Sequence, residues 1–253
     1  MPAATVSVAG RVARVALDRP PLNVIDLGAA NDLAAAFESL RARRDLCAVV
    51  LEGRGRAFCA GVDVRDHLPD RGEEMLHRFH HACLALAAIE APTIASVRGV
   101  ALGGGCELTL MCDLVWAAEG ATFGQPEIQL GVFPPLAAVA LPRLVSPRLA
   151  AEMILTGRVL TAAEAGKAGL VNRVVESETL AGAVEELVGG LSALSPASLR
   201  ITKQALALSR RRPTPEQVWE AEHYYVEHLL HLPDAIEGLT AFMEKRAPAW
   251  ATE

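Results

Sequence analysis

This chain of 253 residues has few aromatic residues, no excess of positive charge and no long apolar run. Aromatic side chains make up 4% of it, and 24 Lys and Arg face 30 Asp and Glu, for a net charge of -6. This balance gives no long-range attraction for nucleic acid or anionic lipid, so we expect neither as a partner. The basic clusters at 41–44 and 210–212 are expected on solvated helix faces. No uninterrupted apolar run approaches the roughly 18 residues of a membrane span.

Paired cysteines and a leader-like N-terminus are also missing. The cysteines are five, an odd number without a C-x-x-C pair: Cys47, Cys59, Cys83, Cys106 and Cys112. Most have apolar neighbours, which indicates buried, reduced thiols. The first 20 residues alternate apolar and polar side chains rather than joining a basic segment to an apolar one, so no signal peptide is expected. We therefore expect a cytoplasmic protein.

What is present is a hydrophobic fraction of 51%, sufficient for a packed core. Alternating side chains predict a hairpin at 6–17 that turns at Ala9 and Gly10. Further elements then alternate: a helix at 27–44, a strand at 47–53, a helix at 71–90, a strand at 92–100, a helix after the glycines and a strand from 113. From about 145 the chain is mostly helical, with a short strand at 171–175. This order predicts an α/β core at 1–195 and a helical C-terminal region at 196–253.

Three consecutive glycines stand before an apolar helical run in GVALGGGCELTLMCDL (99–114). A helix that begins near Gly104 or Gly105 leaves free N–H groups that favour negative charge. Glycine also lets a ligand approach the backbone closely. Glu107 follows Gly104 by three residues, which puts it on the same helix face. The alternative is a tight helix–strand crossing that requires small residues, and this segment alone does not decide between the two.

Two further segments favour a reactive site. RAFCAGVDV (56–64) places Gly61 before Val62, whose N–H could join that of Gly104 in an oxyanion hole. ATFGQPEIQLGVFPP (121–135) places Glu127 in a loop after a proline. Two carboxylates on separate elements could flank one reacting centre. Taken alone, Glu127 would be interpreted as an exposed loop acid.

These three segments together resemble the enoyl-CoA hydratase/isomerase, or crotonase, superfamily, with weaker matches at 160–175 and 237–250. The resemblance implies a ββα spiral core and a C-terminal trimerisation region, in trimers or hexamers. It implies that Val62 and Gly104 form the oxyanion hole and that Glu107 and Glu127 are the catalytic glutamates. It also implies further substrate contacts from seven residues: Leu22, Ala60, Gly61, Asp63, Phe133, Pro135 and Lys245, the last near the coenzyme's phosphates or adenine.

The implied reaction is addition of water to the double bond of an enoyl-CoA or dienoyl-CoA thioester, with no cofactor and no metal. His77, His80 and His81 resemble one helix face and lack a metal-ligand pattern. The alternatives are a double-bond isomerase that uses one glutamate, and a relative that binds acyl-CoA without turnover.

One departure from the family pattern follows Glu127. Hydratases of the family offer a glycine N–H near the catalytic water, whereas Pro135 has no N–H to donate. The segment EIQLGVFPP resembles that of cyclohexa-1,5-dienecarbonyl-CoA hydratases. We therefore expect Pro134 and Pro135 to shape a pocket for a ring or branched chain, lined by Val132, Phe133 and Leu136.

Overall fold

A computed structural model describes residues 2–207 and 214–249 of the chain. The chain folds around two β-sheets. The larger sheet has six strands in the order β1-β2-β3-β4-β6-β9. Their bounds are β1 (Ala4–Ala9), β2 (Val12–Leu17), β3 (Ala48–Gly53), β4 (Thr93–Val97), β6 (Leu114–Ala118) and β9 (Arg173–Val175). The first pair is antiparallel, as a hairpin requires, and the other pairs are parallel. The smaller sheet joins three short strands in the order β5 (Val100–Leu102), β7 (Thr122–Gly124) and β8 (Val159–Thr161).

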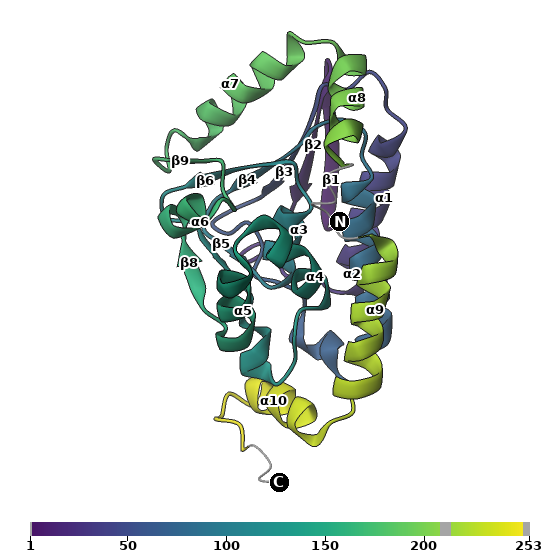
Figure 1. Cartoon of the computed structure of the whole chain (residues 1–253), viewed down its shortest axis with the longest axis vertical. Coiled ribbons are helices and arrows are strands. Elements are labelled where there is room, and N and C mark those ends of the chain that lie inside the picture. The colour runs from purple at the N-terminus through teal and green to yellow at the C-terminus, as the bar shows by residue number, and fades with distance from the viewer. Residues whose placement is uncertain (1, 208–213, 250–253) are drawn as a thin grey trace.

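Helices surround the larger sheet and extend below it (Figure 1). Those before residue 131 are α1 (Leu27–Arg41), η1 (Val64–His67), α2 (Gly72–Ala87), α3 (Gly104–Leu110) and η2 (Pro126–Leu130). The next four are α4 (Pro135–Leu144), α5 (Pro147–Thr156), α6 (Ala162–Ala168) and α7 (Leu180–Ser192). The C-terminal ones are α8 (Pro196–Ala207), α9 (Pro215–Tyr224), its continuation η3 (Tyr225–Leu229) and α10 (Pro233–Met243).

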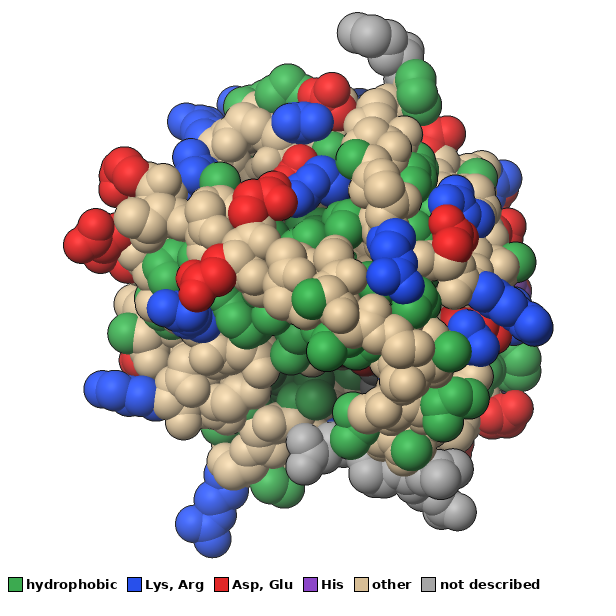
Figure 2. All heavy atoms as spheres, turned by 90° about the horizontal axis from the view of Figure 1, so that it is seen from above, with side chains coloured by type: hydrophobic (Ala, Val, Ile, Leu, Met, Phe, Trp, Pro, Cys, Tyr) green, Lys and Arg blue, Asp and Glu red, His purple; other side chains and the backbone are tan. Residues whose placement is uncertain are grey.

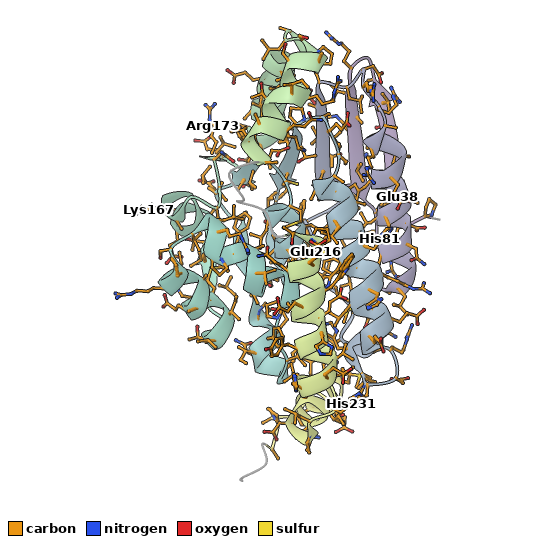
Figure 3. The ribbon with its side chains drawn as sticks, turned by 45° about the vertical axis from the view of Figure 1, so that its right-hand side comes forward. Glu38, His81, Lys167, Arg173, Glu216 and His231 are labelled. Carbon is orange, nitrogen blue, oxygen red and sulfur yellow. The ribbon has the colours of Figure 1, made fainter. Side chains whose placement is uncertain are left out.

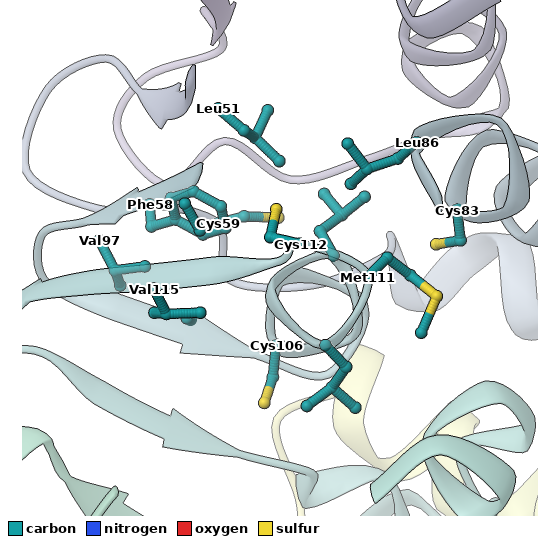
Figure 4. Close-up of a cluster of buried hydrophobic side chains, with 14 of the residues drawn as sticks. Leu51, Phe58, Cys59, Cys83, Leu86, Val97, Cys106, Met111, Cys112 and Val115 are labelled. Carbon is teal, nitrogen blue, oxygen red and sulfur yellow. The ribbon is translucent and has the colours of Figure 1, made fainter. Parts of the chain in front are cut away.

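The central parallel strands β3 and β4 of the larger sheet are buried on both faces, as parallel strands usually are, whereas the edge strand β1 is largely exposed. Side chains of β3 alternate between them: Ala48 and Val50 pack with α7, whereas Val49 and Leu51 join the main core with α1 and α2. Near the middle of that core lies α3, which carries Cys106, and the buried Cys59, Cys83 and Cys112 lie around it (Figure 4). All five cysteines are free and buried, which confirms the expectation of reduced thiols.

The predicted elements are found with shifted bounds. The predicted strand 92–100 is two strands, β4 and β5, in different sheets, because Gly99 turns the chain at φ +64°. The strand predicted from 113 likewise divides into β6 and β7. The first helix ends at Arg41 rather than 44. The basic cluster 210–212 and Trp250, in the last segment of the resemblance, lie outside the described residues.

Charges of both signs are interspersed on the face of the molecule shown in Figure 2. Within the described parts of the chain, no helix combines the length and hydrophobicity needed to cross a membrane.

Candidate active site

A cavity of about 320 Å³ lies where the start of α3, η2, α2 and the C-terminal segment meet. Its volume falls in the range of small-molecule sites. Eight of the predicted site residues line it: Ala60, Gly61, Val62, Gly104, Glu107, Glu127, Phe133 and Pro135. Residues from three distant parts of the sequence therefore meet at one place.

Three predicted contacts do not line this cavity. The backbone carbonyl of Leu22 accepts the N–H of Ala60, a lining residue, at 2.9 Å. Asp63 caps η1 and pairs with Arg65 at 2.5 Å. Lys245 is exposed just after α10, while the neighbouring Arg246 lines the cavity.

The predicted apolar lining is partly wrong. Phe133 lines the cavity, but Val132 and Leu136 are fully buried in the hydrophobic core. Successive side chains of an extended segment point to opposite sides, so Phe133 and its neighbours should have been expected to face different ways. Leu136 points into the core because it lies in the first turn of α4, which begins at Pro135. The apolar walls come instead from more distant elements: Met75, Leu76, Phe79 and Leu130.

The three glycines differ in their roles. Gly103 has a φ of +51°, and a Cβ there would lie 2.6 Å from Glu127 Oε1. At Gly104 a Cβ would meet only side-chain tips, Val62 Cγ2 at 2.8 Å and Phe79 Cζ at 2.9 Å. At Gly105 it would clash with the carbonyl oxygen of Cys59. The close-crossing interpretation is therefore right for Gly105, while Gly103 and Gly104 open the cavity to the backbone.

Two backbone donors are free at this opening. Among the described residues, the N–H groups of Val62 and Gly104 donate to no protein acceptor. They lie close together, because a Cβ on Gly61 would be 3.7 Å from the Gly104 nitrogen. Gly104 is also the first residue of α3, where N–H groups have no partner within the helix.

Glu107 is buried, yet its carboxylate has support. Burial raises its pKa above the usual value, and the influence of His80 and a hydrogen bond from the backbone offset only part of this rise. That bond runs from the Ala137 N–H to Oε1 at 2.8 Å. Ala137 lies in the first turn of α4, where the helix dipole also favours a negative charge.

The two prolines explain how α4 reaches Glu107. Pro134 is the N-cap and Pro135 the first residue of the helix, a position where the fixed φ of proline suits the helix and its missing N–H is not needed. The prolines therefore do more than stiffen a loop. They start a helix whose third residue donates to Glu107.

Glu127 lies on η2 and has a different environment. Burial raises its pKa to about 8, and the negative charge of Glu107 adds to this shift. The buried Gln125 amide lies 3.2 and 3.3 Å from its two carboxylate oxygens. Its oxygen accepts from the protonated acid and its nitrogen donates to the carboxylate, so either orientation supplies a hydrogen bond. At neutral pH the protonated form of Glu127 is favoured.

Comparisons with known proteins agree with this geometry. The family described as Enoyl-CoA hydratase/isomerase matches residues 8–253. The chain belongs to this family. A probable mitochondrial enoyl-CoA hydratase of Dictyostelium discoideum is 36% identical, over 97% of this chain and 90% of that protein. The cyclohexa-1,5-dienecarbonyl-CoA hydratase of Thauera aromatica is 33% identical, over 95% and 93%. The structure of an enoyl-CoA hydratase from Mycobacterium avium subsp. paratuberculosis superposes with a TM-score of 0.87 at 27% identity, covering 99% of each chain.

Within this family fold, two polar side chains of the site were missed by sequence reasoning. His80 and Tyr225 both line the cavity and are almost fully buried. His80 Nε2 and the Tyr225 hydroxyl have no hydrogen-bond partner among the described residues. His80 was interpreted as part of a helix face. Tyr225 lies about 100 residues after Glu127 in sequence, so no local pattern could have joined the two.

Proposed function

We propose that this protein adds water to the carbon–carbon double bond of an enoyl-CoA thioester. One observation carries the proposal: two carboxyl groups line one cavity in different surroundings. Burial raises the pKa of both, but His80 and a backbone N–H oppose this rise only at Glu107, and the charge of Glu107 raises the pKa of Glu127 further. Such a pair supplies a general base and a general acid at the same pH. Relatives named as enoyl-CoA hydratases support the same reaction.

The reaction assigns each group a step. The Glu107 carboxylate takes a proton from water as the water oxygen bonds to the β-carbon. The double-bond electrons move toward the thioester, and negative charge develops on its oxygen. The N–H groups of Val62 and Gly104 stabilise this oxygen, each worth about 3 kcal/mol by analogy with single-donor deletions. Protonated Glu127 then delivers its proton to the α-carbon, which balances the addition of H and OH. No cofactor takes part.

The acyl group is proposed to be cyclic or branched. The cavity walls are apolar and include the rings of Phe79 and Phe133, and the similarity to a cyclohexa-1,5-dienecarbonyl-CoA hydratase points the same way. The reacting water is held by the two glutamates, since Pro135 has no N–H to offer it.

The proposed assembly is a trimer, or a hexamer of paired trimers, through the C-terminal region. Several large apolar side chains of this region are exposed in the single chain, which supports burial between copies. They are Trp219, Tyr224, Leu232, Ile236, Phe242 and Met243. Lys245 is proposed to reach the coenzyme, either in its own chain or in a neighbouring one. Light scattering tests this assembly, and an active monomer would contradict it.

A panel of thioesters tests the function. Loss of the enoyl-thioester absorbance band is measured with crotonyl-CoA and with cyclic dienoyl-CoA substrates, and the products are identified by mass. We expect a gain of one water, with the cyclic substrates preferred. A shifted double bond without added water would favour the isomerase, and binding without turnover would favour the non-catalytic relative.

A further inference from the structure

A buried ion pair joins the C-terminal region to the helix beside the active site. His80 on α2 and Glu222 on α9 are 1% and 4% exposed, and Nδ1 of the imidazole lies 2.5 Å from Glu222 Oε1. Glu222 Oε2 also lies 3.4 Å from Nε2 of the exposed His77. Removing two charges from water costs several kcal/mol per ion, so such a pair is weak evidence for stability. A role other than stability is worth seeking.

The His80 imidazole also forms part of the cavity wall. Nδ1 of His80 is occupied by Glu222, whereas Nε2 is buried without a partner among the described residues. His80 lines the same cavity as Glu107, and α2 packs against α3. The two are close enough for the charge of His80 to favour the ionised form of Glu107. His80 thus contacts Glu222 through one ring nitrogen and lines the cavity that Glu107 also lines.

We propose that His80, held by Glu222, is a positioning residue beside Glu107 that favours its carboxylate form, ready to accept a proton from the attacking water. This inference rests on the proposed hydration reaction. Because Glu222 comes from α9, the C-terminal region contributes to the chemistry through His80 and not only to assembly.

Other titratable groups surround His80 in the described chain, and Glu127, Tyr225 and Arg246 line the same cavity. Its own helix adds His77 and Cys83, about one turn away on either side, and η1 adds His67 to the cavity wall. Burial raises the pKa of the Cys83 thiol well above its usual value, so it is neutral at the pH of the experiment. Asp66 of η1 pairs with Arg71 at 2.8 Å.

The next residue provides a matched control. His81 pairs with Glu38 of α1 at 2.8 Å, with side chains 62% and 52% exposed. Figure 3 shows these two side chains on the α1 and α2 side of the molecule. The same two residue types therefore form one pair at the surface and one beside the cavity.

The experiment measures kcat/KM against pH for His80→Gln and Glu222→Gln, with His81→Gln and Glu38→Gln as controls. The substrate is an enoyl-CoA that the wild type hydrates. We expect the acid limb of both buried variants to move up by about one pH unit, which means about a tenfold lower rate below that limb. The alkaline limb and KM should stay unchanged, and both surface variants should follow the wild type. A lower rate with both limbs unmoved would overturn the proposal, as would an equal shift in the surface variants.

Two additions keep the test decisive. A His80→Leu/Glu222→Leu double variant removes both charges, a replacement that is often neutral for stability, and thermal unfolding verifies its fold. It should show the same shift of the acid limb, and an unmoved limb in the folded double variant would overturn the proposal. Infrared titration of the Glu107 carboxyl band, assigned with Glu107→Gln, should show the carboxylate forming at higher pH in His80→Gln than in wild type. This readout decides the proposal even if the wild type hydrates no enoyl-CoA, an outcome that would count against the proposed function alone.

Discussion

Glu107 and Glu127 line one cavity but lie on segments that differ in burial. Glu107 lies on α3, all seven residues of which are buried, and it receives an N–H from α4 and the positive charge of His80. Glu127 lies on η2, in which no residue is fully buried, yet its carboxyl group turns inward toward Gly103 and Gln125. The causes that shift its pKa include no cation. The same side chain thus has different surroundings in the two segments, because the protein supports its charge more at Glu107 than at Glu127. This difference fits the proposed roles of Glu107 as base and Glu127 as acid.

The largest expected effect removes either carboxyl group. Glu107→Gln and Glu127→Gln should each lower kcat for hydration by at least about 100-fold, the lower range for a general acid–base group. Steady-state rates with the preferred enoyl-CoA measure this, and circular dichroism verifies folding. If either variant keeps a near-wild-type rate, that glutamate is a bystander, the comparison between the two breaks, and the isomerase gains support.

A smaller effect is expected from the glycines on the α3 side. Gly104→Val should lower kcat/KM by more than about tenfold, because its side chain meets Val62 and Phe79 at the opening to the free N–H groups. Only side-chain tips must move, so the melting temperature should fall by a few degrees. The matched variant Gly105→Val meets the Cys59 carbonyl and should unfold at a much lower temperature. Equal losses of stability in the two variants would mean that Gly104 serves packing alone.

The contrast between the carboxyl groups should also appear in stability. Glu127 has a pKa of about 8 in the folded state and one near 4.3 when unfolded. Its contribution is fully present below the unfolded pKa and is lost as pH rises through the folded pKa, by at most about 1.4 kcal/mol per pH unit. Glu127→Gln, which cannot ionise, should therefore lose less stability than wild type between pH 5 and 8. Denaturant unfolding at pH 5 and pH 8 measures the free energy of unfolding of both proteins. Equal losses in the variant and the wild type would contradict the raised pKa of Glu127.

The smallest effect is expected at Pro135, next to the α4 turn that supports Glu107. Pro135→Gly restores a backbone N–H at the start of α4 and should raise the rate on crotonyl-CoA relative to a cyclic dienoyl-CoA by a few-fold. Competition between the two substrates measures the ratio directly. If the wild type already hydrates crotonyl-CoA as efficiently as any cyclic substrate, the pocket is not specialised.

Local sequence patterns predicted the hairpin, the alternation of strands and helices, the helix start at Gly104 and the reduced cysteines. They did so because these features depend on side-chain alternation, glycine and capping within a few residues. The different environments of Glu107 and Glu127 could not be predicted from local sequence patterns, because the groups that create them are distant in the sequence. Ala137 is 30 residues from Glu107, and Glu222 is 142 residues from His80. The roles of Val62, Gly104 and Lys245, and the boundary near residue 195, stay predictions.

The most direct test of two carboxyl groups in opposite protonation states is kcat/KM for water addition, measured across pH 5 to 10 with the wild-type protein. Because protonated Glu127 donates the proton to carbon, the rate should be highest near neutral pH and fall above about pH 8, following one ionisation. The acid side should fall with protonation of Glu107. A rate that stays constant or rises from pH 7 to 10 would contradict the account, because the acid that it assigns would then be unnecessary.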